Sequence, residues 1–358
     1  MTASGRETGE ALMKSRERVA RALRGEPTDR PALAYLFLGG ARHVLTRVGR
    51  PMAEAGRDPR LMAATQATAA EMFGHDSAMI PWGCMTVEAE AFGCGLEFPD
   101  HYYPRVVTRP LEDDPGLSRL AQPDPSRSGR MPIVVEGLAR LRERAGDDLF
   151  ITAMVVSPFL VAAELRGLMG LLKDFVADPP YVEALFERVT AGTARYVEAI
   201  LAGGACDAIL FENAGACREI MGPHHLERYV LPHHRRLLAA ARRTAPDVLL
   251  VEHNCARTPY FDAILGLDVD AVSFAHGDLG TLRTRRGPDR DRPMAWIGNV
   301  DNTRIMLEAT PEEVYREARA CIASAAGAPF VLSTACEIPF KAPIDNILAL
   351  SRAVRAGF

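Results

Sequence analysis

The sequence has no long uninterrupted apolar run. The longest, from Phe150 to Ala163, is broken by Ser157 and Pro158, and it is shorter than the roughly 20 residues that cross a bilayer. The charged residues near the amino terminus are not followed by the apolar stretch of a signal peptide. We therefore expect no membrane anchor and a cytoplasmic protein.

An excess of charge of either sign is also missing. The chain holds 42 Lys and Arg against 46 Asp and Glu, which gives a formal net charge of −4. Proteins that bind nucleic acid or anionic membranes do so through strongly basic faces. Neither nucleic acid nor a membrane surface is therefore an expected partner.

Cysteine is sparse, and the nucleotide-binding motifs are absent. The seven cysteines are odd in number and scattered, which is not the pattern of a disulfide framework. We expect reduced thiols that are available to a metal. The chain also has no G-x-G-x-x-G after its first predicted strand and no P-loop, which argues against an open nucleotide-binding sheet.

Apolar, strand-like runs alternate with amphipathic helical segments along the chain. The eight predicted strands are residues 33–38, 77–81, 149–156, 208–211, 248–252, 271–274, 294–298 and 330–333. The predicted helices are residues 11–24, 58–73, 134–144, 161–175, 181–202, 226–243, 260–266, 310–326 and 344–356. Alternation of this kind implies a parallel sheet, and eight units in a chain of this length favour a closed (β/α)8 barrel.

The whole chain is predicted to form one domain. Residues 1–10 read as a flexible tail, and residues 11–358 as a single α/β unit, a (β/α)8 TIM barrel with an N-terminal helical extension. Residues 93–130 are rich in Pro, Asp and Gly and show little periodicity. We expect this segment to pass over one mouth of the barrel, and the sequence leaves open whether it acts as a lid.

Three residues at predicted strand ends have the side chains of a zinc site. His253 and Cys255 follow the strand that ends at Glu252, and Cys336 follows the strand that ends at Ser333. Imidazole and thiolate are the ligands that zinc prefers, and three protein ligands leave one position open for chemistry. Strand ends of a barrel converge at its carboxyl-terminal mouth. We therefore predict a zinc site formed by His253, Cys255 and Cys336.

A different interpretation of these residues stays open. With nine histidines and seven cysteines, a His-x-Cys arises by chance about 0.2 times in this chain, so the motif alone is weak. Cysteines of cytoplasmic proteins also often serve as small core residues. We assign that structural role to the five cysteines without a partner at ligand spacing, Cys84, Cys94, Cys206, Cys217 and Cys321.

Further polar residues follow other predicted strands. Glu212 is a candidate to bind a proton, and His276 is a candidate fourth or exchangeable zinc ligand, so both are predicted to be catalytic. The predicted substrate-binding residues are Asn213, Asp278, Asn299 and Glu337, the last of which can also support the adjacent Cys336. Two histidine pairs, His224–His225 and His233–His234, are assigned surface or packing roles, and the arginines between 283 and 292 a solvated loop.

Several short segments together resemble the uroporphyrinogen decarboxylase superfamily, and most closely its zinc-dependent, corrinoid-linked methyltransferase branch. The segments that carry the resemblance are Ser15–Val19, Leu23–Pro27, Thr86–Gly93, Ser157–Phe159, Ala163–Gly167, His253–Cys255, Gly298–Asp301 and Cys336–Pro339. Each is weak alone, but their order and spacing over nearly the whole chain are fairly specific. The resemblance implies a (β/α)8 barrel, and it implies that His253, Cys255 and Cys336 match the zinc triad of that branch.

Two departures separate the chain from the decarboxylase itself. The loop Leu38–His43 holds only one arginine, Arg42, where the decarboxylase has a glycine- and arginine-rich loop that grips carboxylates. Gly83 stands near the position of a key aspartate. The decarboxylase also needs no zinc, which would leave the predicted triad without a role.

The resemblance implies a methyltransferase that moves a methyl group between a corrinoid and a small thiol activated as a zinc thiolate. No D-x-H-x-x-G corrinoid module is present, so we expect the cobalamin on a partner protein or as a free cofactor. Two alternatives remain. A metal-free decarboxylase of a porphyrinogen-like or other carboxylate would keep its activity after chelation, and a non-catalytic corrinoid- or tetrapyrrole-binding barrel would bind corrinoid without the triad. The sequence leaves the oligomeric state open, a homodimer included.

Overall fold

A computed structural model describes residues 13–38, 42–82, 84–284 and 294–356. The predicted tail at residues 1–10, Gly83, and most of the predicted arginine-rich loop lie outside the described residues. None of the helices in the described part of the chain is both long and apolar enough to cross a membrane.

Eight parallel strands form one sheet, as predicted. They are β1 (Ala32–Leu33), β2 (Ser77–Ile80), β5 (Phe150–Val156), β6 (Ala208–Glu212), β7 (Leu249–Asn254), β8 (Ala271–Phe274), β9 (Ala295–Val300) and β10 (Phe330–Thr334). Their order is β1-β10-β9-β8-β7-β6-β5-β2, and every pairing is parallel. The two outer strands meet where the Asp76 amide donates to the Leu33 carbonyl at 2.8 Å, so the sheet curls into a nearly closed barrel.

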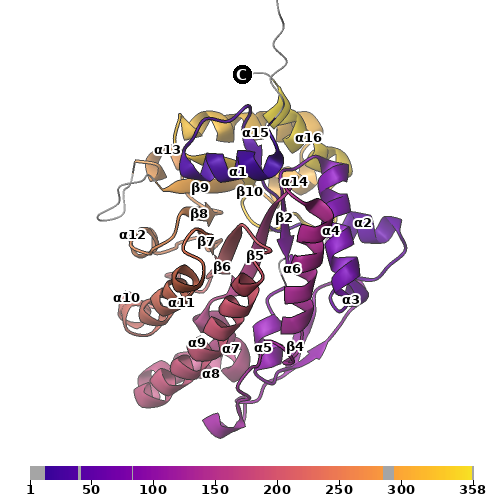
Figure 1. The fold of residues 1–358 in the computed structure, drawn as a ribbon. Coiled ribbons are helices and arrows are strands. Elements are labelled where there is room, and N and C mark those ends of the chain that lie inside the picture. The colour runs from indigo at the N-terminus through magenta and orange to yellow at the C-terminus, as the bar shows by residue number, and fades with distance from the viewer. Residues whose placement is uncertain (1–12, 39–41, 83, 285–293, 357–358) are drawn as a thin grey trace, which may run out of the picture.

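Helices form a layer around the strands (Figure 1). The helices are α1 (Ser15–Arg24), α2 (Arg42–Arg47), α3 (Met52–Ala55), α4 (Pro59–Phe73), α5 (Val87–Ala91), α6 (Met131–Ala145), α7 (Pro158–Arg166), α8 (Leu168–Ala177), α9 (Pro179–Ala202), α10 (Pro223–His225), α11 (Leu231–Thr244), α12 (Phe261–Leu265), α13 (Leu279–Leu282), α14 (Arg304–Glu308), α15 (Pro311–Ala325) and α16 (Ile344–Arg355). A 3-10 turn at Leu117–Arg119 and a π-helical turn at Leu226–Val230 complete the set. The (β/α)8 architecture predicted from the sequence is confirmed.

Three sequence predictions need correction in detail. The first strand is only Ala32–Leu33, and residues 34–38 stay buried outside it, although the Ala34 amide still donates to the Leu332 carbonyl of β10 at 2.9 Å. The predicted helix 161–175 is two helices, because Gly167 has φ +77°, a conformation that ends α7 and that glycine adopts most readily. Residues 93–130 contain an antiparallel hairpin, β3 (Gly95–Glu97) and β4 (Arg105–Thr108), that the sequence pattern did not indicate.

A repeated contact joins the amino-terminal ends of alternate strands. An aspartate precedes each of β2, β6 and β8, and its carboxylate accepts from a backbone amide of the neighbouring strand. The three pairs are Asp76 with Leu33, Asp207 with Ile151 and Asp270 with Leu250. Each aspartate also pairs with arginine: Arg18 and Arg30, Arg16 and Arg142, and Arg242, respectively.

The first helix lies across this end of the barrel. Helix α1 contacts β1, β2, β5, β9 and β10, and its arginines reach two of the three aspartates. Gly25 ends the helix in the left-handed conformation with φ +73°. The amino-terminal mouth is therefore covered, and the residues predicted for function gather at the opposite mouth.

Candidate metal centre

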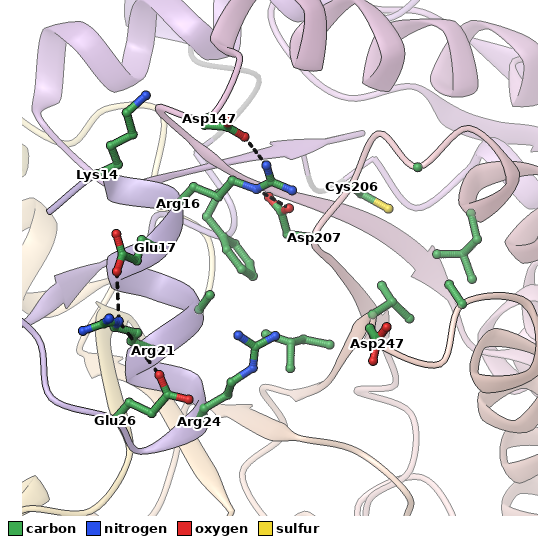
Figure 2. Close-up of a pocket in the computed structure, with 17 residues that line it drawn as sticks. Lys14, Arg16, Glu17, Arg21, Arg24, Glu26, Asp147, Cys206, Asp207 and Asp247 are labelled. Atoms are coloured by element: carbon green, nitrogen blue, oxygen red, sulfur yellow. Dashed lines mark hydrogen bonds and ion pairs between the residues drawn. The ribbon is translucent and has the colours of Figure 1, made fainter.

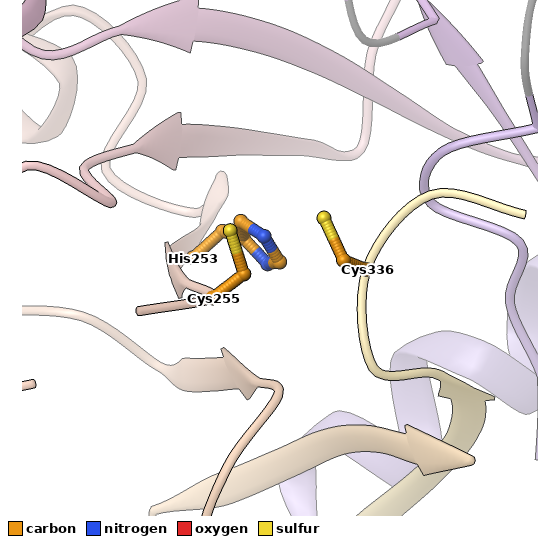
Figure 3. Close-up of side chains that lie close together, drawn as sticks. All are labelled: His253, Cys255 and Cys336. Carbon is orange, nitrogen blue, oxygen red and sulfur yellow. The ribbon is translucent and has the colours of Figure 1, made fainter. Parts of the chain in front are cut away.

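One imidazole and two thiols meet at the carboxyl-terminal mouth of the barrel. His253 is the second-last residue of β7, Cys255 follows that strand directly, and Cys336 lies two residues after β10. One possible ligand atom from each lies within 4.8 Å of the other two. Figure 3 shows Cys336, from the loop after β10, facing His253 and Cys255, which lie together at the end of β7. The structure therefore brings the three predicted ligands together, although β7 runs two residues past its predicted end at Glu252 and includes His253.

The strand register explains the position of His253. It pairs with Glu212 on β6 and with Ser273 on β8, so these three side chains form a row on one face of the sheet. The His253 Nδ1 lies 2.9 Å from the Ser273 hydroxyl oxygen, and its Nε2 lies 3.6 Å from a Glu212 carboxylate oxygen. Glu252, one residue earlier, points to the other face. The alternation of the strand thus decides which side chains reach the mouth.

The hydrogen bond to Ser273 prepares His253 to bind a metal. When Nδ1 carries the proton and donates to the hydroxyl oxygen, Nε2 keeps its lone pair free to bind a metal. This Nε2 is buried and has no hydrogen-bond partner within the described residues. A buried ring nitrogen without a partner is rare in folded proteins, and a metal ion would satisfy it.

Burial and close contacts raise the pKa of three groups at the centre. The hydrogen bond with Cys336, together with burial, raises the pKa of the Cys255 thiol. Burial raises the pKa of Glu212. Burial opposes protonation of His253, but the nearby Glu212 and Cys255 raise its pKa on balance. The raised pKa makes the Cys255 thiolate harder to form without a nearby cation, and one imidazole with two cysteine sulfurs is a donor set that suits zinc.

The segment at residues 93–130 reaches the metal centre through one tyrosine. Tyr103, from the hairpin connection, hydrogen-bonds with the Glu337 carboxyl group and donates to the Trp82 carbonyl at 2.8 Å. Burial raises the pKa of Glu337 to about 8. Asn302 donates to the Glu337 backbone carbonyl at 3.0 Å. The residue beside Cys336 is thus held from two sides.

The other predicted residues are described by their hydrogen bonds and their exposure. Asn213 donates to Glu252 at 2.9 Å, and Asn299 donates to the Gly277 carbonyl at 3.4 Å. Asp278 accepts from the Thr281 amide and caps α13. His276 is exposed and lies outside the group of three ligand atoms. Roles in substrate binding or catalysis remain predictions for these residues.

Sequence reasoning missed several partners of the centre. Ser273 had a weak signal, as a polar residue within a short apolar strand. Glu252 was treated only as a strand end, but it is fully buried and lies 2.8 Å from His234 Nε2 on α11. This contact packs His234 inside the protein, which is one of the two roles, surface or packing, predicted for that histidine pair. Tyr103 had no local signal, because its contact with Glu337 spans 234 residues of sequence.

Comparison with known proteins extends this picture. The uroporphyrinogen decarboxylase family model matches residues 14–357. A methylated-thiol–coenzyme M methyltransferase of Methanosarcina mazei is 28% identical over 83% of this chain and 77% of its own length. A methylcobamide:CoM methyltransferase of Methanosarcina acetivorans is 26% identical over 93% of this chain and 95% of its own length. The solved structure of a methyltransferase from Methanosarcina mazei shares the fold with a TM-score of 0.85 at 23% identity, covering 96% of this chain and 98% of that one.

Proposed function

Because this chain belongs to the uroporphyrinogen decarboxylase family, we propose that it is a zinc-dependent methyltransferase of that family, acting between a corrinoid and a small thiol. Relatives over most of the chain are named as a methylated-thiol–coenzyme M methyltransferase and a methylcobamide:CoM methyltransferase. The observation that carries the proposal is the meeting of His253, Cys255 and Cys336 at the mouth of the barrel. Decarboxylation of a porphyrinogen would give these three side chains no role.

The three ligands would hold zinc with one coordination position open. When bound, zinc would lower the pKa of an incoming thiol and hold it as a nucleophilic thiolate. Ser273 fixes the orientation of the His253 ring through its 2.9 Å contact with Nδ1. The two cysteine ligands compensate the charge of the ion, which keeps the bound sulfur electron-rich for attack on a methyl group.

Glu212 has the position and the environment of a proton acceptor for the incoming thiol. One of its carboxylate oxygens is 3.6 Å from His253 Nε2. Burial raises its pKa, which moves a carboxylate toward the range where a general base works best near neutral pH. The Ala214 amide donates to the other oxygen at 3.1 Å and fixes the direction of the carboxylate. We assign Glu212 to receive the thiol proton.

The corrinoid must come from outside the chain. No D-x-H-x-x-G module occurs in the sequence, so the methyl group has to be presented on a corrinoid protein or on free methylcobalamin. The acceptor that fits an open position on zinc is a small thiol, and the names of the relatives point to thiols of the coenzyme M type. The mouth of the barrel that holds His253, Cys255 and Cys336 would have to admit both the corrinoid and the thiol, so that the two reactants are held close together.

Metal content by elemental analysis tests the proposal first. We expect close to one zinc per chain in the wild type and a strong reduction in Cys336→Ala. Methyl transfer from methylcobalamin to a small thiol should fall at least about 100-fold in that variant. Replacing a residue that only supports a metal ligand lowers activity about 10–100-fold, and replacing the ligand itself should lower it more. Cys206→Ala, at the other end of the barrel, is the matched control and should keep both zinc and activity.

Three outcomes would contradict the proposed methyltransferase or favour one of its alternatives. Freshly purified protein that holds no zinc and cannot be reconstituted would contradict the mechanism. Decarboxylase activity that survives a chelator would favour the metal-free alternative. Tight corrinoid binding without turnover, unchanged when His253, Cys255 and Cys336 are replaced by alanine, would favour a carrier.

A further inference from the structure

The segment that follows β1 brings one aromatic ring to the metal centre. The centroid of the Phe37 ring lies 4.5 Å from that of the His253 imidazole, and the two ring planes are inclined at 56°. This spacing is at the close end of the range for paired aromatic rings. Phe37 is only 6% exposed, and His253 is fully buried. The imidazole is therefore packed against a ring in a contact that is shielded from solvent.

This contact joins opposite sides of the barrel. In the order β1-β10-β9-β8-β7-β6-β5-β2, β7 is the fourth strand from β1 in one direction. It is also the fourth in the other direction, because the barrel closes where the Asp76 amide donates to the Leu33 carbonyl. A side chain that follows β1 therefore meets a predicted ligand that is carried by the strand across the mouth.

A bend in the backbone accompanies this contact. In a regular strand, Tyr35 and Phe37 would point to the same face. The backbone bends at Leu36, which lies between them, and their rings have different neighbours. The Tyr35 ring lies 4.5 Å from the ring of His75, whereas the Phe37 ring lies against His253. The early end of β1, which the sequence pattern did not predict, thus turns Phe37 toward the metal centre.

The backbone of Phe37 is tied to the loop that carries Cys336. The Ile338 amide donates to the Phe37 carbonyl at 2.9 Å. The same loop is also held by Asn302, which donates to the Glu337 carbonyl at 3.0 Å. Phe37 thus contacts both parts of the centre, the imidazole through its side chain and the loop of the second cysteine through its backbone.

Two neighbours together restrict the imidazole. The Ser273 hydroxyl oxygen lies 2.9 Å from His253 Nδ1 and holds one edge of the ring. A single hydrogen bond still lets a ring tilt about that contact, whereas a second ring packed beside it limits the tilt, because protein interiors are close-packed. The orientation of Nε2, which has no hydrogen-bond partner within the described residues, is thereby restricted as well.

We propose that Phe37 is a positioning residue of the metal centre, whose ring holds the His253 imidazole in the orientation that binds a metal ion together with Cys255 and Cys336. Phe37 offers no ligand atom and acts through His253. Its apolar ring also keeps water away from this ligand, a property of the surroundings that tunes metal sites. The inference deepens the proposed function and rests on its metal centre, but it does not depend on the identity of the thiol or of the methyl donor.

The zinc affinity of Phe37→Leu tests the proposal, measured on the whole protein by competition with a chromogenic chelator. Leucine keeps the position apolar but lacks the ring that lies against the imidazole. We expect zinc to bind about tenfold more weakly than in the wild type, at the lower end of the range for residues that support a metal ligand. If this variant does not fold, Phe37→Met fills the space with a flexible chain and should show the same loss.

Phe150→Leu is the matched control, because it makes the same change at the opposite end of the barrel. Phe150 begins β5 and is 2% exposed. It lines a pocket of about 600 Å³ between α1 and the starts of β5, β6 and β7, which Figure 2 shows. Both variants should lower the melting temperature, because each removes buried apolar contacts. Only Phe37→Leu should also lower the zinc affinity.

Cobalt(II) in place of zinc gives a readout that a loss of stability alone would not change. The visible absorption of this ion reports the geometry of its ligands, which the orientation of the imidazole helps to set. We expect the absorption bands of cobalt-loaded Phe37→Leu to shift or broaden relative to the wild type. Those of Phe150→Leu should match the wild type.

A double variant tests whether Phe37 and Ser273 act on the same ring. An imidazole that is released by either change alone already leaves its metal-binding orientation. Phe37→Leu combined with Ser273→Ala should therefore lose less zinc affinity than the product of the two single losses, as expected for residues that share a partner. The shortfall should be at least about threefold.

Three results would overturn this inference alone. Zinc affinity and a cobalt spectrum in Phe37→Leu that equal those of the wild type would remove the ring from the site. An equal loss of zinc affinity in Phe150→Leu would assign the effect to general destabilisation. Single losses that multiply in the double variant would show that Phe37 does not act on the ring that Ser273 holds. A wild type that binds no zinc would instead overturn the metal centre itself, and this inference with it.

Discussion

The two ends of the barrel both gather ionisable side chains, but their partners differ. At the amino-terminal end, Asp76, Asp207 and Asp270 each accept from a neighbouring strand and pair with arginine. At the carboxyl-terminal end, the structure shows no arginine paired with Glu212 or Glu337 among the described residues, and burial raises the pKa of both. One end fixes its charges in contacts that hold strands together, and the other holds carboxyl groups whose pKa is raised by burial and that have no arginine partner among the described residues.

Within one fold, the residues that stabilise the barrel thus lie at one end and the residues suited to chemistry at the other. Paired charges at strand starts satisfy backbone amides and define how the strands align. Groups with perturbed pKa values and few partners are typical of functional sites, and in (β/α)8 barrels they gather at the carboxyl-terminal mouth. We therefore expect changes at the amino-terminal end to affect unfolding and changes at the mouth to affect metal binding and activity. Three substitutions test this separation.

Asp207→Asn should have the largest effect on stability. It leaves Arg16 and Arg142 without the charge they share. Because these contacts are only partly buried, the cost should be about 3 kcal/mol of unfolding free energy, at the lower end of the range for buried ion pairs. Denaturant unfolding measures this, and zinc content should not change. Asp147→Asn removes the other, exposed partner of Arg16 and should cost less than about 1 kcal/mol. A similar loss in both variants would show that the buried contact has no special role.

Glu88→Gln should change how stability depends on pH. Glu88 accepts from the Val156 amide at 2.9 Å at the carboxyl end of β5, and burial raises its pKa from 4.5 to about 7. The folded protein therefore keeps this proton up to about pH 7, whereas the unfolded chain releases it near pH 4.5. Stability contributed by this group is present below pH 4.5 and is lost as the pH rises toward 7.

Unfolding at two pH values measures the effect of Glu88→Gln. Relative to the wild type, the variant should gain up to about 3 kcal/mol between pH 5 and pH 8, because the amide keeps the hydrogen bond without a proton to lose. Glu136→Gln, an exposed acid on α6, should show no such gain. A wild type and Glu88→Gln with parallel pH profiles would contradict the raised pKa.

Ser273→Ala should have the smallest free-energy effect of the three substitutions. The effect should be on metal binding at the carboxyl-terminal mouth and not on unfolding. The substitution removes the contact that holds His253 Nδ1, and loss of such a supporting contact weakens metal affinity by about 10–100-fold. Competition with a chromogenic chelator measures zinc affinity, and Ser273→Thr should restore it. Ser77→Ala, a buried serine at the start of β2, is the control for the opposite end. Unchanged zinc affinity in Ser273→Ala would remove this residue from the site.

Much of the fold follows from local patterns in the sequence. Apolar runs and amphipathic helices recur with a period that specifies a barrel, and the strand positions differ from prediction mostly by one or two residues. The first strand is the exception, because residues 34–38 are as buried as a strand without pairing as one. An apolar run in the sequence predicts that a segment is buried. Whether that segment also pairs as a strand depends on whether another strand lies alongside it in the fold.

The candidate site was accessible to sequence reasoning only in part. His253, Cys255 and Cys336 were identified because each carries a ligand atom and follows an apolar run. Ser273 and Tyr103 were missed because their roles depend on strand register and on a distant contact. The arginine pairs of Asp76, Asp207 and Asp270 were missed for the same reason, since nothing near those aspartates in the sequence marks them as different from surface acids.

The row formed by Glu212, His253 and Ser273 limits how this protein can vary in length. A strand alternates its side chains between two faces, so adding or deleting one residue early in β7 would turn His253 outward and bring Glu252 to the mouth. The same change in a connecting loop would leave the row intact. Diversification of this centre over evolution is therefore confined to substitutions within the strands and to insertions between them.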